Sequence, residues 1–246
     1  MTQISSFNRT SFEGPLTAFF SSLVGASCTN FLEKHLVKVQ VQKMVPIEEL
    51  ARNPFRGLSL QFYKLFAKTG VVLTIQPTLK SFSAKKVDSP ILASFTAATI
   101  SGLVQNYLFA MLNYRLVHVY SKAMSAEEYK KTPYLTRFKG SHIAGVYTMI
   151  FWGTFFSISE SVEKVTKPIY AWMLGGIGAE SLSYPLKVFI TNIRADSGSS
   201  RPTQIFLKLK KEGKFYRGFS ISCLRSSMLG GITCLCKEIV LKNLSK

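Results

Sequence analysis

Two cations and a phenol stand at matching positions in three segments of this chain. Lys64, Tyr147 and Arg225 each lie seven residues after the glycine of a short triplet that reads aromatic, basic, glycine. Lysine and arginine side chains pair with carboxylates and phosphates. At one height in a cavity, the three side chains would suit a small anionic solute. Alternatively, Lys64 and Arg225 reach the nearer membrane interface or pair with a carboxylate within a helix, for which Glu180 is the candidate.

The triplets are a second candidate site, suited to phosphate groups. They are Phe55-Arg56-Gly57, Phe138-Lys139-Gly140 and Tyr216-Arg217-Gly218. Each opens an apolar stretch, and a helix N-terminus offers unpaired N–H groups and a partial positive charge. Glycine allows close approach, and the adjacent Arg56, Lys139 or Arg217 adds charge. The alternative is ordinary anchoring of basic side chains at a membrane interface.

A constant step separates three further landmarks upstream of the triplets. Phe31-Leu32-Glu33, Leu108-Phe109-Ala110 and Pro185-Leu186-Lys187 begin 77 residues apart. A fixed period of this kind indicates one structural unit used three times. Each unit holds two long apolar segments, so the sequence predicts six in all.

Composition indicates that these segments cross a membrane. The chain is 47% hydrophobic and yet carries a formal net charge of +18. Its apolar runs are long and its cations lie mostly between them, as in helical membrane proteins. We therefore expect one all-α membrane domain over residues 1–246, with repeats at about 12–86, 87–166 and 167–246. The predicted segments are about 15–42, 58–82, 90–120, 140–162, 168–194 and 218–244.

The longer links between segments, at about 43–57, 121–139 and 195–217, are basic. An even number of spans places both termini on one side, so these links would share the other side. We expect short amphipathic helices in them, as the run Ile205-Phe206-Leu207-Lys208-Leu209-Lys210-Lys211 indicates for the third.

These features resemble the mitochondrial carrier family. There, a signature Pro-x-[Asp/Glu]-x-x-[Lys/Arg] ends each odd helix, and an aromatic-[Arg/Lys]-Gly triplet begins each even one. The third unit matches best, with Pro185 and Tyr216-Arg217-Gly218. The resemblance implies six tilted helices around a central cavity in the mitochondrial inner membrane, with both termini toward the intermembrane space. It also implies that Lys64, Tyr147 and Arg225 are substrate-contact positions and that the triplets hold cardiolipin phosphates.

The chain departs from the family at both gates of the cavity. In the family, acid and base positions of successive signatures pair around the ring. The acid positions here hold Glu33, Ala110 and Lys187, and the base positions hold Leu36, Asn113 and Ile190. None of these combinations is an ion pair, so Glu33 and Lys187 need other neighbours or water. Only Pro185 keeps the signature proline, so the first two odd helices should run straighter.

The second gate, on the even helices, keeps one possible pair. Its acid positions hold Pro77, Glu160 and Glu238, and its base positions hold Lys80, Glu163 and Leu241. Only Glu238 with Lys80 would form a family-type pair. Two networks that form and break set the balance between the two states of an alternating-access carrier. A chain that retains one pair has a weak switch.

We therefore expect a degenerate carrier-like protein with little or no transport. It would act as an accessory subunit of an inner-membrane complex of the respiratory or ATP synthase type. The alternative is an active carrier that exchanges a small anionic metabolite. Neither reading is an enzyme, and cardiolipin is the only bound group we expect. The cysteines and histidines lack metal-ligand spacing, and cations that flank apolar segments do not favour nucleic acid.

Overall fold

The protein is an all-helical bundle in a computed structural model that describes residues 3–41, 55, 57–85, 87, 89–121, 126–196 and 200–244. No strand occurs among these residues, as the all-α prediction requires. The helices are α1 (Gln3–Val41), α3 (Leu58–Ala84), α4 (Pro90–Leu108), α5 (Ala110–Ser121), α6 (Ala126–Lys131), the 3-10 helix η1 (Tyr134–Phe138), α7 (Ser141–Glu163), α8 (Pro168–Ala195), α9 (Pro202–Lys211) and α10 (Phe219–Leu244).

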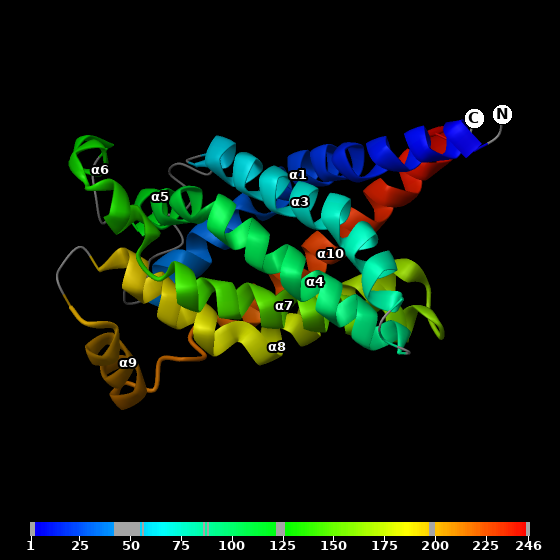
Figure 1. Cartoon of the computed structure of the whole chain (residues 1–246). Helices are drawn as coiled ribbons and strands as arrows, with labels where there is room; N and C mark the ends of the chain where they lie inside the picture. Colours follow the sequence, from blue (N-terminus) through cyan, green and yellow to red (C-terminus); the bar gives the residue numbers. More distant parts are fainter. Residues whose placement is uncertain are drawn as a thin grey trace.

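The long helices form a closed ring. Helix α1 packs on α3, α3 on α4, α4 on α7, α7 on α8, α8 on α10, and α10 returns to α1. Figure 1 shows the free ends of α1 and α10 together at one end of the bundle, and α6 and α9 at the opposite end. The short helices of the second and third long links therefore share one end, and the chain termini share the other.

Helix boundaries follow local signals in the sequence. Pro90 and Pro168 occupy the first positions of α4 and α8, where a missing N–H costs nothing and the fixed φ angle suits a helix. Ser89 adds a cap, since its side chain accepts a hydrogen bond from Leu92 N at 3.4 Å. The predicted segments agree with the observed helices to within a few residues, except that α1 begins at Gln3 rather than near residue 15.

The second odd segment is broken, which contradicts the expectation of a straight helix. Helices α4 and α5 meet at Phe109 with a bend of 66°. By contrast, α8 runs without a break through Pro185. Packing explains the bend, because α4 lies against α3 and α7, whereas α5 turns to contact α1, α8 and η1. A proline was therefore neither necessary nor sufficient for a break in this ring.

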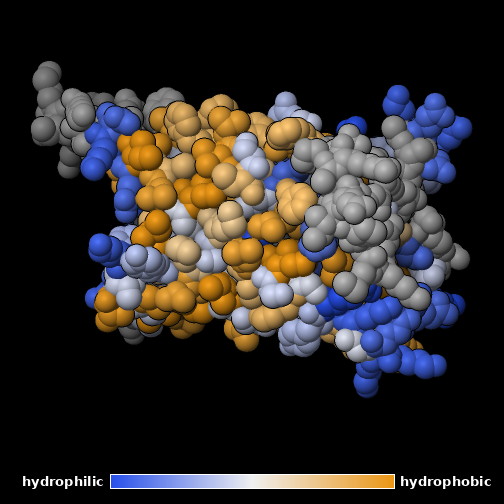
Figure 2. Space-filling view, turned by 180° about the vertical axis from the view of Figure 1, so that it is seen from behind, coloured by the Kyte–Doolittle hydropathy of each residue, from blue (hydrophilic) through white to orange (hydrophobic). Residues whose placement is uncertain are grey.

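The bundle has an inside-out distribution of polarity. Its interior buries polar side chains on every long helix, among them Ser22, Asn30, Gln61, Gln105, Ser183 and Ser222. Large apolar side chains point outward, among them Phe19, Leu23, Tyr63, Leu108, Leu182 and Ile239. Figure 2 shows apolar surface across the middle of the face in view, with hydrophilic side chains gathered toward both ends. Exposed apolar surface this extensive marks a face that is covered by lipid or protein.

Length and composition alone identify fewer membrane spans than six. Among the described residues, Phe219–Asn243 is long and apolar enough to cross a membrane. The bent pair Pro90–Leu108 and Ala110–Ser121 passes the same test as one broken span. The other long helices of the described residues do not pass this test.

Candidate functional site

The three triplet glycines begin α3, α7 and α10 in the same backbone conformation. Gly57, Gly140 and Gly218 have φ angles of 81°, 76° and 83°, in the left-handed region that favours glycine. Each glycine carbonyl accepts a first helical hydrogen bond, from the N–H four residues on, at 2.9, 2.9 and 3.1 Å. The residue seven positions after each glycine therefore lies two turns into its helix, on the same side relative to the start.

Each of these glycines also packs on the next odd-numbered segment around the ring. A Cβ atom on Gly57 would lie beside Tyr120 of α5, and one on Gly140 beside Ile193 of α8. A Cβ atom on Gly218 would lie beside Leu36 of α1. The contacts thus run in one direction and close on themselves, so the three helix starts make equivalent contacts around the ring.

The candidate contact residues meet inside the ring. Lys64, Tyr147 and Arg225 all line one cavity of about 100 Å³. This placement agrees with the equal spacing of the three residues from their glycines. Tyr147 and Arg225 also line an adjoining cavity of about 110 Å³, which extends toward the end that holds the chain termini.

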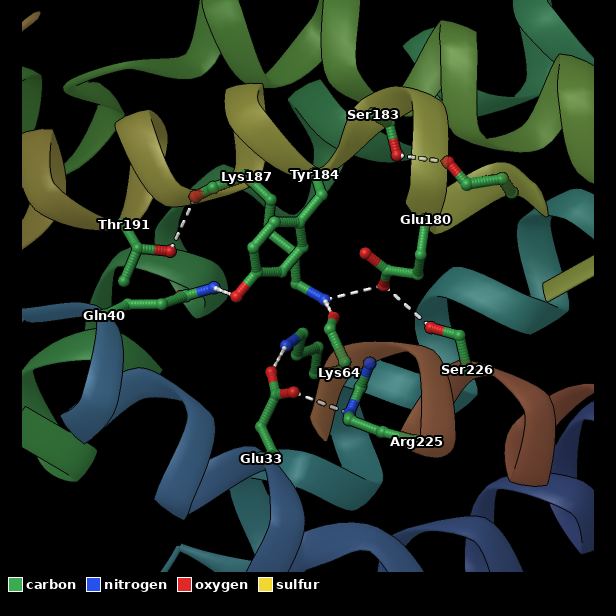
Figure 3. Close-up of polar contacts among 12 residues, drawn as sticks. Glu33, Gln40, Lys64, Glu180, Ser183, Tyr184, Lys187, Thr191, Arg225 and Ser226 are labelled. Carbon is green, nitrogen blue, oxygen red and sulfur yellow. Dashed lines mark hydrogen bonds and ion pairs between the residues drawn. The ribbon is translucent and has the colours of Figure 1, made fainter. Parts of the chain in front are cut away.

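Glu33 of α1 binds both cations of this group. Lys64 Nζ donates to Glu33 Oε1 at 2.5 Å, and Arg225 Nε forms an ion pair with Glu33 Oε2 at 2.6 Å. All three side chains are at most 12% exposed. Figure 3 shows the carboxylate between the two cations. Lys64 and Arg225 thus pair with a carboxylate within a helix, as one of the two alternatives held, but that carboxylate is Glu33 and not the candidate Glu180. Glu33 therefore joins α1 to both of its neighbours in the ring, α3 and α10.

Glu180 serves Lys187 instead, and both belong to α8. Lys187 Nζ lies 2.7 Å from Glu180 Oε1 and donates to Ser222 Oγ at 2.6 Å. Ser226 Oγ also donates to Glu180 Oε1, at 2.7 Å. The two charged residues are seven positions apart, or two helical turns, which places them on the same inner face of α8. Lys187 has no family-type ion-pair partner, and Glu180 and Ser222 take that place.

A further buried hydrogen-bond chain joins α1, α8 and the third triplet. Gln40 Nε2 donates to Tyr184 Oη at 3.2 Å, and that hydroxyl donates to the carbonyl of Arg217 at 2.5 Å. We did not predict a role for Gln40 or Tyr184. The only sequence signal was a tyrosine directly before Pro185, because the two partners are 144 residues apart.

The pair at the other gate differs from the predicted one. Lys80 Nζ of α3 lies 2.7 Å from Glu160 Oε1 of α7, not beside Glu238. Ser94 of α4, which lies between these helices in the ring order, donates to the same Glu160 oxygen and so holds it toward α3. Lys80, Glu160 and Glu238 all line a wider cavity of about 630 Å³.

The basic residues of the triplets lie in different surroundings. Lys139 Nζ donates to both the carbonyl and the Oδ2 atom of Asp196, each at 3.0 Å, so it is bound to the end of α8. Arg217 lines a polar hollow between α8, α9 and α1. Arg56 lies outside the described residues. Whether the triplets bind a phosphate stays a prediction.

The cavity beside Glu33 carries an excess of positive charge. The charged side chains that line it are Glu33, Lys64, Lys68, Lys187, Arg194 and Arg225. Glu33 neutralises one cation of the Lys64 and Arg225 pair, and Glu180 bonds to Lys187 from the adjoining cavity. Lys68 and Arg194 form no ion pair within the part of the chain that the structure describes.

Other functional chemistry is sparse. No three His, Cys, Asp or Glu side chains are grouped to hold a metal ion anywhere in the described ranges. Comparison of the chain with protein-family models gives no match, and comparison with curated proteins gives no relative.

Proposed function

We propose that the chain is a degenerate mitochondrial-carrier-like protein of the inner membrane. Its six long segments would cross the bilayer as three two-helix repeats, with both termini toward the intermembrane space. It would act as a structural or accessory subunit of a respiratory or ATP synthase type complex, with little or no transport of its own. The closed ring and the equivalent contacts of the three glycine starts support the repeat architecture.

Polarity supports the membrane address. Many polar and charged side chains are buried inside the ring beside three apolar clusters, while large apolar side chains cover much of its outer surface. In a lipid environment this arrangement satisfies buried polar groups internally and leaves apolar groups to the acyl chains. It also explains why most of the helices fail a simple hydropathy test, since their inner faces are polar.

The double ion pair of Glu33 is the observation that carries the structural role. Lys64 and Arg225 occupy the positions that would receive an anionic substrate, and both are bound to one buried carboxylate of the protein. A substrate would have to take both cations from Glu33, and a buried carboxylate that loses its partners costs several kcal/mol. The two cavities here, about 110 and 100 Å³, are well below the ~300 Å³ at the small end of ligand pockets.

The second ion pair supports the same conclusion. Glu180 and Lys187 both belong to α8, so their bond does not join one repeat to the next. An alternating-access carrier needs bonds between repeats that break and re-form on opposite sides of the substrate. A bond within one helix gives no such switch, because it persists whichever way the repeats rotate.

A second candidate function is exchange of a small anionic solute. It is favoured by the excess of cations around the inner cavity and by the wider cavity beyond Lys80 and Glu160, which gives access from the terminal end. In this reading Glu33 would hold the cations only until an anion arrives. Lys64, Tyr147 and Arg225 would then be the contact residues.

Cardiolipin is the lipid that we propose at the helix starts. Three left-handed glycines open three helices, and N–H groups in the first turn of a helix have no partner within it. Leu58 N and Phe219 N already donate to the carbonyls of Phe55 and Tyr216, so the N–H groups that follow them are the candidates. A phosphate at each helix start would accept hydrogen bonds from these N–H groups, as other anions do at helix N-termini.

Two measurements on the full chain test the structural role. First, membranes from cells that express a tagged chain are solubilised in a mild detergent, and the solubilised proteins are separated on a native gel. We expect the chain to migrate with a complex far larger than its own 27.5 kDa. Second, the purified chain is reconstituted into liposomes with phosphate, a dicarboxylate or a nucleotide inside, and uptake of the same labelled anion is followed. We expect uptake no higher than in protein-free liposomes.

Two matched double variants show whether any observed uptake depends on the inner cations. Lys64→Ala with Arg225→Ala removes the two inner cations, whereas Arg201→Ala with Lys210→Ala removes two exposed ones. Saturable uptake that only the inner double variant abolishes, together with migration as a single chain, would establish the carrier and overturn the structural role.

A further inference from the structure

Arg194 is a buried cation without a partner of its own. It lies near the end of α8, and its side chain is 7% exposed. Its Nε and Nη2 atoms are buried and donate no hydrogen bond to any of the described residues. A guanidinium with idle donors inside a protein is costly, because it has lost its hydration and gained no anion in return.

Lys68 of α3 lines the same cavity as Arg194 of α8, and α3 and α8 stand opposite each other in the ring. Lys68 likewise makes no hydrogen bond or ion pair with the part of the chain that the structure describes. Lys64 and Arg225 have Glu33, and Lys187 has Glu180, so the two carboxylates that line the inner cavities within the described residues are already engaged. The charge that would balance Arg194 and Lys68 must come from elsewhere.

The space between them limits what can supply that charge. The cavity is about 100 Å³, which admits a small ion and excludes a nucleotide or a lipid headgroup with its glycerol. Its wall also carries the amide groups of Asn106 and Asn113, whose N–H donors suit the oxygens of a tetrahedral anion. Asn106 Nδ2 keeps one N–H for this after it donates to the Ser141 carbonyl. A guanidinium presents its donors as a fork that matches two such oxygens.

We infer that this cavity holds one small oxyanion of the size of phosphate, bound between Arg194 and Lys68. Lys64, Tyr147 and Arg225 line the same cavity, but Lys64 and Arg225 are bound to Glu33, so the anion is assigned to Arg194 and Lys68. The anion would be a resident part of the fold, because it offsets the two uncompensated cations of the ring interior. The inference rests on the interior of the ring alone, so it holds whether or not the chain belongs to a larger complex.

Equilibrium dialysis of the purified full chain against radiolabelled inorganic phosphate tests the site. We expect saturable binding of one phosphate for each chain, with sulfate as a competitor and chloride without effect. Arg194→Gln removes the fork, and we expect it to weaken binding by about tenfold or more, the scale of a lost charge-assisted hydrogen bond. The control Arg201→Gln makes the same change on the exposed surface of α9 and should leave binding within about twofold.

Two further variants separate loss of the site from loss of the fold. Arg194→Lys keeps the charge and should retain part of the affinity, whereas Lys68→Gln should weaken binding and its surface control Lys210→Gln should not. Circular dichroism and gel filtration check that each variant folds. The inference is overturned if the wild type binds no phosphate saturably, or if folded Arg194→Gln and Lys68→Gln variants bind as the wild type does. Liposome uptake and native-gel migration are independent of these outcomes.

Discussion

The two halves of the ring use the same kind of ion pair in opposite settings. Near the triplet end, Glu33 and Lys64 are 6% and 12% exposed, and the cavity around them is about 100 Å³. Near the terminal end, Glu160 and Lys80 are 26% and 36% exposed, and their cavity is about 630 Å³. One half of the ring is therefore closed around its charges, and the other half is open to solvent.

This contrast indicates which charges hold the fold. A buried carboxylate between two cations has no water to replace a missing partner, so its removal leaves uncompensated charge. A half-exposed pair is screened by water, and its loss is nearly neutral. We therefore expect stability to depend on the closed half, and any solute to reach only the open half.

The largest effect is expected from Glu33→Gln. The variant leaves Lys64 and Arg225 buried beside each other without a carboxylate, which should lower the free energy of unfolding by about 3–5 kcal/mol. Thermal unfolding of the chain in detergent measures this, and for a chain of this size we expect a fall in Tm of roughly 10 °C.

Two controls sharpen this test. Glu33→Asp keeps the charge and should lose less than half as much stability. Combining Glu33→Gln with Lys64→Met and Arg225→Met removes all three charges and should recover most of the loss, because buried ion clusters can be replaced by apolar groups of similar size. A Glu33→Gln protein that unfolds at the wild-type temperature would refute the contrast between the halves.

Glu180→Gln should have the next largest effect. Lys187 would lose its carboxylate but keep the Ser222 hydroxyl, and the glutamine oxygen still accepts from Ser226. We expect a loss of about 2 kcal/mol, because one cation rather than two is left uncompensated. The same thermal measurement applies, with Glu163→Gln as the control at an exposed site on α7. A loss as large as that for Glu33→Gln would show that bonds within α8 matter as much as bonds across the ring.

The helices of this ring were predictable because their signals are local. Prolines at the first positions of α4 and α8, glycines before α3 and α7, and long apolar runs fix the starts and ends within a few residues. The positions of Lys64, Tyr147 and Arg225 in one cavity were also predictable, because equal spacing from equivalent helix starts gives equal depth.

The partners of the charged residues were not predictable in the same way. The pairing of Glu33 with Lys64 and Arg225 depends on how α1, α3 and α10 are rotated about their axes, which no local pattern fixes. The choice of Glu160 over Glu238 by Lys80 depends on Ser94, a residue from a third helix. The bend at Phe109 follows from the packing of α5, and no proline near it predicts the bend from the sequence.

A smaller effect is expected at the helix starts of the closed half. Gly57 and Gly213 both have positive φ angles, but a Cβ atom on Gly57 would meet the Tyr120 ring at 2.5 Å, whereas one on Gly213 would meet nothing within 4 Å. Gly213→Ala should cost about 1 kcal/mol, from backbone strain alone. Gly57→Ala should cost about 1 kcal/mol more, because Tyr120 must shift. Equal melting temperatures for the two variants would mean that the packing at Gly57 is looser than its geometry indicates.

The smallest effect is expected at the open half, from Glu160→Gln. Lys80 would lose its carboxylate, but its side chain is 36% exposed and water can take the place of the lost partner. We expect the free energy of unfolding to change by less than about 1 kcal/mol, within the range of exposed pairs. Added salt should reduce the difference in unfolding free energy between Glu160→Gln and the wild type, because salt screens exposed charges. It should have little effect on the loss caused by Glu33→Gln, because buried charges are screened much less. Thermal unfolding of Glu160→Gln is measured beside Glu33→Gln in the same detergent. If Glu160→Gln lost several kcal/mol of unfolding free energy, the open half would have to close around Lys80, and buried charge would seal both ends of the ring.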